Sequence, residues 1–209
     1  MSIEPFTPKD FRVFDIPGFA ERMAALRAQV SPKLGAIGEA LAPRLASVVR
    51  TEVFPHVARH ARRTVNPPDD TWVALGPDRR GYKKAQHFKV AVSRHCMRFL
   101  FELGPEYAAK PEWARSFKRE TPRLAKALGK TPGLGWFKNE HDEEPAAALA
   151  GLDAAAWQRL ADEITRTRDG QLVLGRRVEA GEAARWRGAD YERAALETFA
   201  ALGDCFRLR

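Results

Sequence analysis

The sequence predicts an α+β fold: a single domain over residues 1–209, with a mostly antiparallel sheet of about five strands packed with helices. Helical periodicity fills the first 50 residues and much of the C-terminal half. Short β-patterned segments follow one another between residues 71 and 103, with links too short for crossover helices. Neither a low-complexity linker nor a repeat of about 20–50 residues divides the chain, which is long enough for one core.

Cap signals and apolar stripes place the N-terminal helices. Thr7 followed by Pro8 starts a short helix that reaches residue 14. The next helix carries apolar residues at i, i+4, i+7 and i+11: Phe19, Met23, Leu26 and Val30. Ser31 and Pro32 restart the helix, and Pro43 is expected to kink or break it. A further helix is expected over residues 51–63, before the prolines at 67 and 68.

Strands and helices then alternate along the rest of the chain. Strands are expected over residues 71–75, 87–92, 97–103, 133–137 and 172–174. Helices are expected over residues 111–128, 153–168 and 189–206. The acidic segment 139–144 is expected to be a solvated connector, and His141 within it a structural residue.

Composition limits the classes of protein. No apolar run approaches the ~20 residues that span a bilayer, and the N-terminus lacks a signal-peptide pattern, so we expect a cytoplasmic protein without a membrane partner. The two cysteines, Cys96 and Cys205, lie far apart and outside any CxxC pair, so neither a disulfide framework nor a thiolate metal site is expected. A net charge of +8 favours anionic partners. Oligomeric state does not follow from the sequence.

The basic character is concentrated in one segment. Residues 56–98 hold ten Lys and Arg against three acids, which accounts for +7 of the net charge of +8. Four of the five histidines also lie there: His56, His60, His87 and His95. Within the expected helix 51–63, the residues His56, Arg59, His60 and Arg63 would share one face. Local charge of one sign indicates an interaction surface.

The string FPHVARHARRTVNPPDDTWVALG, followed by RRGYKK and HFKV, resembles the YktB-like family of small bacterial proteins of unknown function. The opening FTPKDF and the stretch ERMAALRAQVSPKLGAIGEALAP are similar to the same family. The resemblance covers residues 6–95 closely and the remainder loosely, with a departure after Phe88 at VSRHCMR. It implies a compact α+β domain of about this length and carries no activity.

The first functional hypothesis is binding of a polyanion or a phosphorylated ligand, with nucleic acid or a phosphorylated small molecule as the partner. Arginine forks and lysine charges match phosphate oxygens, and a tyrosine between them can stack on a base. The expected anion-binding residues are Arg59, Arg62, Arg63, Arg79, Arg80, Tyr82, Lys83, Lys84 and His87. The competing interpretation is a solvated face whose arginines pair with Asp69, Asp70 and acids elsewhere.

Two other classes of function remain open. His56 and His60 are candidate catalytic residues for metal-independent phosphoryl transfer or nucleic-acid processing, with arginines stabilising charge. Their HxxxH spacing also suits one metal ion, but it lacks the glutamate of zinc hydrolases and lies among positive charges. No metal and no cofactor are therefore expected. A protein-interaction module using Trp157, Trp186 and Phe199 is the third class.

Overall fold

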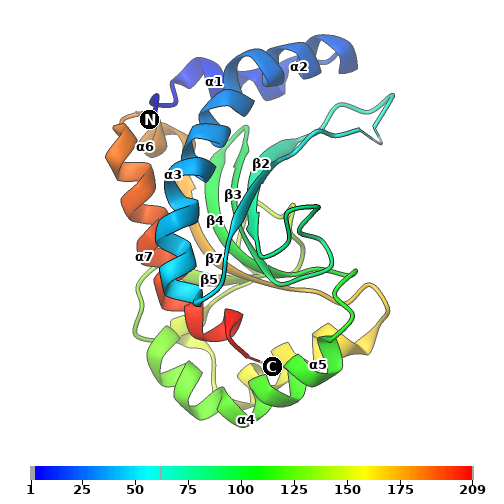
Figure 1. The fold of residues 1–209 in the computed structure, drawn as a ribbon, viewed down its shortest axis with the longest axis vertical. Helices are drawn as coiled ribbons and strands as arrows, with labels where there is room; N and C mark the ends of the chain where they lie inside the picture. Colours follow the sequence, from blue (N-terminus) through cyan, green and yellow to red (C-terminus); the bar gives the residue numbers. More distant parts are fainter. Residues whose placement is uncertain (1–2, 62, 209) are drawn as a thin grey trace.

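A seven-stranded sheet, antiparallel at every pairing, runs through the molecule (Figure 1). The computed structural model describes residues 3–61 and 63–208. In spatial order the strands are β1 (Phe54–Val57), β2 (Asp70–Gly76), β3 (His87–Ser93), β4 (Cys96–Leu103), β7 (Leu172–Glu179), β5 (Leu134–Phe137) and β6 (Ala147–Ala148). Strand β7 therefore lies between β4 and β5, although 68 residues separate it from β4 in the chain.

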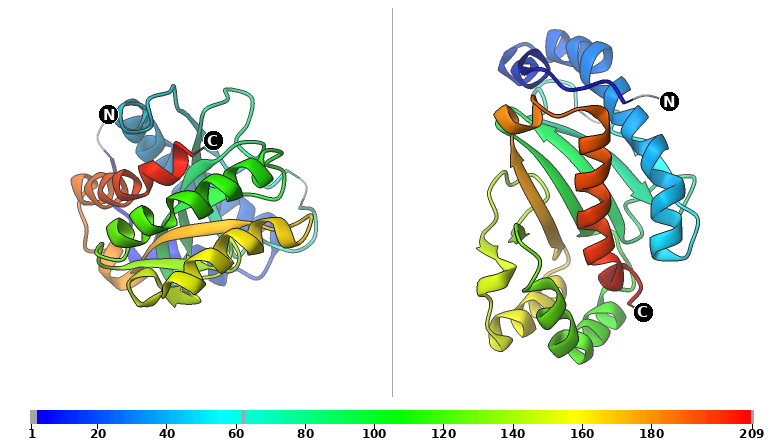
Figure 2. Two further views of the ribbon diagram at one scale, coloured as in Figure 1. Left: turned by 90° about the horizontal axis from the view of Figure 1, so that it is seen from below. Right: turned by 90° about the vertical axis from the view of Figure 1, so that its left-hand side faces the viewer.

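Two long helices cover one face of the sheet (Figures 1 and 2). They are α3 (Ser31–Val49), over β1 and β2, and α7 (Gly188–Phe206), over β3, β4 and β7. At one end of this layer lie α1 (Pro8–Arg12), the 3-10 turn η1 (Val13–Asp15), α2 (Phe19–Ala25), the π-helical turn η2 (Leu26–Val30) and α6 (Ala180–Ala183). At the other end lie α4 (Lys110–Leu128), η3 (Leu149–Gly151) and α5 (Ala154–Arg166). None of the described helices combines the length and the apolarity that crossing a membrane would need.

The main core forms between this helical layer and alternate residues of the strands. Side chains of a strand point to opposite faces in turn, so Val73, Leu75, Phe88, Val90 and Val92 meet the helices. Val73 and Phe88 are fully buried there. The strand residues that alternate with these core residues point to the opposite face of the sheet. Connecting segments, rather than α3 or α7, lie over that face. That second face holds the candidate site.

The α+β class is confirmed, with seven strands where about five were expected. The five expected strands are all present, and β2 and β7 extend beyond the expected bounds. The two additional strands are β1 and the two-residue β6. Short pairings of this kind lack a pattern long enough to be distinguished from loop in the sequence.

The expected helix over residues 51–63 is wrong. Helix α3 ends at Val49, Arg50 takes a left-handed conformation, and the chain then forms strand β1 beside β2. Pro55 lacks an N–H group and disfavours a helical predecessor, and it fits at the sheet edge that β1 occupies. The i, i+4 spacing of His56 and His60 therefore does not place them on one helical face.

Of the kink or break expected at Pro43, the break is absent. Helix α3 is continuous from Ser31 to Val49 with Pro43 inside it. Its apolar stripe is buried on both sides of the proline, at Leu34, Ile37, Leu41, Leu45 and Val49. Packing of this stripe on the sheet offsets the hydrogen bond that proline removes.

Candidate functional site

Charged side chains occupy alternate positions of the central strands on the second face of the sheet. They include Asp70 on β2, His87 and Lys89 on β3, and Arg98 and Glu102 on β4, and all five are buried. Antiparallel pairing brings them together, because His87 lies opposite Glu102 in the register of β3 and β4. Buried charges need partners, and these residues supply them for one another.

Arg98 forms a buried ion pair on this face. Its Nη2 donates to Asp70 Oδ2 at 2.6 Å, and its Nη1 donates to the carbonyl oxygens of Glu140 at 2.9 Å and Asp142 at 2.7 Å. Burial opposes ionisation of Asp70, but hydrogen bonds and charge from His141 and Arg98 hold the pKa of the Asp70 carboxyl below its usual value. Asp70 is therefore a carboxylate at neutral pH.

Lys89 forms a second buried pair beside the first. Its Nζ lies 2.6 Å from Glu102 Oε2, also contacts Glu140 Oε2, and sits 4.7 Å from the centroid of the Trp72 ring. Burial would favour the neutral amine, but the charges of Glu102 and Glu140 outweigh it and raise the pKa of Lys89. Two buried cations thus hold the segment around residue 140 onto the sheet.

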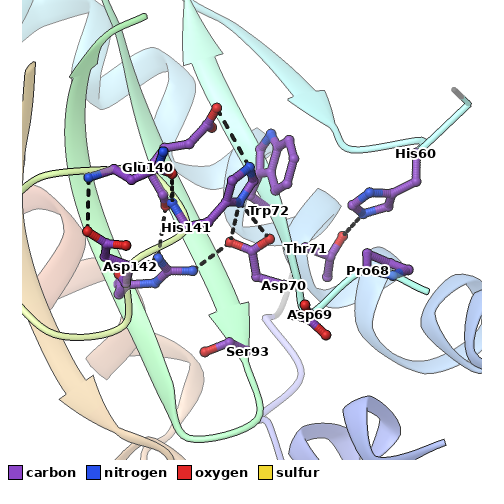
Figure 3. A network of polar contacts seen from close by, with 12 residues as sticks. His60, Pro68, Asp69, Asp70, Thr71, Trp72, Ser93, Glu140, His141 and Asp142 are labelled. Atoms are coloured by element: carbon purple, nitrogen blue, oxygen red, sulfur yellow. Dashed lines mark hydrogen bonds and ion pairs between the residues drawn. The ribbon is translucent and has the colours of Figure 1, made fainter. Parts of the chain in front are cut away.

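The acidic segment is not the solvated connector that was expected. Figure 3 shows Glu140, His141 and Asp142 arranged over the start of β2. His141 Nδ1 donates to Asp70 Oδ1 at 3.0 Å, while 44% of the His141 side chain stays exposed. The hydrogen bond that His141 donates to Asp70 raises the pKa of His141 above its usual value of 6.5. His141 is thus the residue that sequence reasoning set aside and that the structure places at the site.

His60 approaches the same point from the β1–β2 connection. Its backbone has φ 49°, in the left-handed region that few residues other than glycine adopt, and its Nε2 lies 3.1 Å from Thr71 Oγ1. Burial lowers the pKa of His60, although the charge of Asp70 opposes this shift. The ring of His60 meets the Trp72 ring edge-on, with centroids 5.3 Å apart.

Trp72 lies between the two imidazoles (Figure 3). The ring centroids of His141 and Trp72 are 5.8 Å apart. Trp72 lies near the start of strand β2. Trp72 is half-buried rather than part of the main core. We refer to His60, Asp70, Trp72 and His141 as the Trp72 cluster.

Tyr82 and His56 have structural contacts on the same face. Trp72 Nε1 donates to the Tyr82 hydroxyl at 2.9 Å, and the Tyr82 ring packs edge-on against His87 with centroids 4.7 Å apart. His56 Nε2 lies 2.9 Å from the carbonyl oxygen of Asp78, and its ring is 5.8 Å from that of Tyr82. Two of the expected site residues, Tyr82 and His87, thus pack against other residues of this face. His56 and His60 have different partners, Asp78 and Thr71 respectively.

The expected cations fall into two groups. Lys89, Arg94 and Arg98 are already paired with acids, in the case of Arg94 with Asp15 at 2.7 Å. Six others are exposed and form no ion pair within residues 3–61 and 63–208: Arg59, Arg63, Arg79, Arg80, Lys83 and Lys84. Arg79 also packs over the Phe54 ring at 4.9 Å. Arg62 lies outside the described residues.

These exposed cations lie on two loops at opposite ends of β2. Arg59 and Arg63 belong to loop 58–69, which precedes β2 and extends away from the sheet in Figure 1. The other four belong to loop 77–86, which follows it. Seven residues of strand at ~3.3 Å each separate the two loops by roughly 20 Å. The two loops therefore flank the β1–β2 edge instead of forming one helix-and-loop cleft.

Two cavities lie elsewhere in the described part of the molecule. A cavity of about 470 Å³ has Gly133, Arg176 and Trp186 in its wall, and one of about 410 Å³ has Trp136 and Arg166. Neither contains an expected site residue. Among residues 3–61 and 63–208, no group of three or more His, Cys, Asp or Glu is placed to hold a metal ion.

A signal for the missed residues was present in the strands. HFKVAVS carries His87 and Lys89 two positions apart, and CMRFLFEL carries Arg98 and Glu102 four positions apart, so each pair falls on one face of a strand that is otherwise largely apolar and buried throughout. Such alternation indicates that one face of a central strand carries a satisfied polar network. It does not identify the partner segment, which is why His141 and Glu140 were missed.

Comparison with known proteins gives a family and relatives. The family model described as "Domain of unknown function (DUF1054)" matches residues 6–206. A UPF0637 protein of Bacillus licheniformis is 33% identical over 182 residues, which cover 87% of this chain and 85% of that protein. A UPF0637 protein of Shouchella clausii is 34% identical over 100% of this chain and 96% of the relative, and one of Bacillus velezensis is 31% identical over 97% and 95%. These names state no activity.

Proposed function

The chain belongs to the DUF1054 family, as its resemblance to YktB-like proteins predicted, and since that family has no stated activity we propose a function from the site itself. We propose that the protein binds a single-stranded nucleic acid along the β1–β2 edge. In this proposal the phosphates of the nucleic acid contact loops 58–69 and 77–86. The bases of the nucleic acid lie over the second face of the sheet near Trp72. The observation that supports this proposal is the set of six exposed cations that form no ion pair with any residue the structure describes.

The acids of the same segment do not neutralise these cations. Asp70 is bound to Arg98 and His141, and Asp69 lies 3.4 Å from Arg22 on α2. Asp78 accepts a hydrogen bond from the backbone N–H of Arg80 at 2.8 Å, which shapes loop 77–86. The positive charge on both loops is therefore available to an anion from solution.

The distance between the two loops favours a polymeric ligand rather than a ligand with a single phosphate. A small anion would contact one loop, whereas the two loops are roughly 20 Å apart and span several consecutive phosphates of an extended strand. Arginine matches phosphate oxygens with a planar fork of donors, and both loops contain arginine.

Aromatic rings lie between the two loops, where the bases of such a strand would lie. Trp72 and His56 are half-buried and His141 is exposed, all on the second face. Rings of this kind stack on bases of any sequence. This arrangement supports binding with little sequence preference, because the phosphates and stacking surfaces are common to all nucleotides.

Charge reversal on each loop tests the proposal. The variants are Arg59→Glu/Arg63→Glu and Arg79→Glu/Arg80→Glu, and the probe is a labelled single-stranded oligonucleotide of about 12 nucleotides. Each double variant should weaken binding at least about tenfold at constant salt, because two phosphate contacts become repulsions. Fluorescence anisotropy measures the dissociation constant.

The matched control reverses two exposed arginines in the helical layer, Arg44 on α3 and Arg193 on α7. Arg44→Glu/Arg193→Glu changes the net charge by the same amount on the opposite side of the sheet. It should keep affinity close to that of the unaltered protein. Equal affinity for the loop variants and this control would contradict the proposed binding edge.

A further inference from the structure

One long helix of the molecule changes its winding partway along its length. Helices α2 and α3 join without a gap through the π-helical turn η2, in which the N–H of Ser31 donates to the carbonyl oxygen of Leu26. Single π-helical turns inside helices are rare and frequently lie at functional sites. The charged side chain of this turn is Arg27, which is exposed.

The π-helical turn lies close to the base of loop 58–69. Figure 1 shows α2 and this loop at the same end of the molecule. Arg22 of α2 is buried, donates from Nη1 to the carbonyl oxygen of Pro68 at 2.9 Å, and lies 3.4 Å from Asp69 Oδ1. Arg27 follows Arg22 by five residues, which places it roughly 7 Å farther along the axis of the same helix.

Two arginines from different segments act on the imidazole of His60. Burial lowers the pKa of His60, the charge of Asp70 opposes this shift, and the charges of Arg63, His141 and Arg27 add to it. Arg63 belongs to the same loop as His60, whereas Arg27 belongs to η2. The helix and the loop thus bring their positive charges toward one point.

The loop itself is held in an unusual conformation at that point. His60 has φ 49°, and the backbone N–H of Arg63 donates to the carbonyl oxygen of His60 at 3.0 Å, which closes a tight turn. Its ring is held by Thr71 Oγ1 at 3.1 Å and by the edge contact with Trp72. Strained backbone is concentrated at functional positions. Two irregular backbone segments, η2 and the turn at His60, are therefore found at the same end of the molecule.

No acid among the described residues neutralises these two arginines. Arg27 and Arg63 are exposed and form no ion pair within residues 3–61 and 63–208. Asp70, the acid whose charge acts on His60, is already bound to Arg98 at 2.6 Å and to His141 at 3.0 Å. Cations that gather without a counter-charge attract an anion from solution.

We propose that Arg27, His60 and Arg63 form a further phosphate subsite between η2 and the loop, which holds one phosphate of the bound strand; this rests on the proposed function. Two guanidinium forks approach the phosphate from different segments, and the imidazole lies beside it. The strand then has three points of contact, at loop 77–86, loop 58–69 and η2. It continues past the start of β2 onto the helical end of the molecule.

The first test removes the charge contributed by the helix. Arg27→Gln should weaken binding of the labelled 12-nucleotide single strand at least about fivefold, measured by fluorescence anisotropy. The slope of log affinity against log salt should become shallower by about 0.7, because one fewer phosphate is neutralised. Arg12→Gln on α1 removes another exposed arginine that forms no ion pair with the described residues, and affinity should stay within about twofold.

A double-mutant cycle tests whether the two arginines hold the same phosphate. The affinity loss in Arg27→Gln/Arg63→Gln should be smaller than the product of the two single losses by at least about threefold, because the second substitution acts on a contact already weakened. The losses in Arg27→Gln/Arg79→Gln should multiply, since Arg79 lies on the other loop.

The imidazole provides a readout that a structural role of Arg27 would not change. A phosphate beside His60 favours the imidazolium, so the pKa of His60 measured by NMR should rise when the same oligonucleotide is added. The rise should be smaller in Arg27→Gln, in which the phosphate is held less firmly.

Equal affinity of Arg27→Gln and Arg12→Gln for the oligonucleotide would overturn the inference and leave the proposed function intact. Losses at Arg27 and Arg63 that multiply would also overturn it, because the two arginines would then hold different phosphates. Absence of oligonucleotide binding by the unaltered protein would overturn both.

Discussion

His141 and Asp70 form the pair on which the site depends at the scale of single residues. We predict that the pKa of His141, measured by NMR titration, lies above 6.5 and falls in Asp70→Asn, because the hydrogen bond that His141 donates to the Asp70 carboxylate raises it. Since the folded-state pKa is raised, the stabilisation from this pair is fully present below pH 6.5 and is lost as pH rises through that pKa. A pKa at or below 6.5 in the unaltered protein would contradict the assignment.

A prediction about stability concerns Arg98, which pairs with Asp70 on its buried side. Arg98→Met leaves Asp70 buried without its cation, and we expect a loss of about 3–5 kcal/mol in the free energy of unfolding, measured with urea. Arg166→Met on α5, which removes an exposed i, i+3 pair with Glu163, should cost less than about 1 kcal/mol. Similar losses for the two variants would mean that Arg98 and Asp70 are not buried together.

The residue scale is also where sequence reasoning was least complete. His60 was correctly placed in a basic segment, but the residues around it come from elsewhere: Asp70 and Trp72 from β2, and His141 from a position 81 residues farther along the chain. His141 stands in an acidic, loop-like stretch, and nothing local indicates that Asp70 accepts a hydrogen bond from it. Local sequence patterns predict which face of an element a side chain lies on. They do not predict which residues from distant parts of the chain will contact it, because those contacts depend on the fold.

At the scale of elements, β1 shows why a helical spacing was misleading. The spacing of His56 and His60 matches one helical face, yet Pro55 and the pairing offered by β2 make residues 54–57 an edge strand. By contrast, the hairpin of β3 and β4 and the helices α4, α5 and α7 lie within a few residues of their expected bounds. Long periodic segments carry their own signal, and a four-residue strand does not.

Gly38 tests the packing of α3 on this edge strand. A Cβ at this position would lie 2.7 Å from Val73 Cγ2 and 2.8 Å from Pro55 Cβ, so the helix approaches β1 and β2 closely. Gly38→Leu should lower the free energy of unfolding by about 1–3 kcal/mol through overpacking, measured with urea. Gly181→Ala on α6, where a Cβ meets nothing within 4 Å, should be neutral or slightly stabilising. Tolerance of Gly38→Leu would contradict β1 lying under α3.

At the scale of the whole molecule, the sheet has two faces of different character. One face packs on α3 and α7 and builds the core, while the other carries the polar network and the Trp72 cluster. The α+β class and the single basic segment were predictable from composition and periodicity. The insertion of β7 between β4 and β5 was not, because strand order depends on packing of segments far apart in sequence.

The most direct measurement is the affinity for a single-stranded oligonucleotide as a function of salt concentration. If about five phosphates contact the two loops, the logarithm of the association constant should fall against the logarithm of salt with a slope between about −3 and −4. Arg59→Glu/Arg63→Glu should make the slope shallower, because fewer counterions are released. Affinity that stays constant from low to physiological salt would contradict binding along the β1–β2 edge.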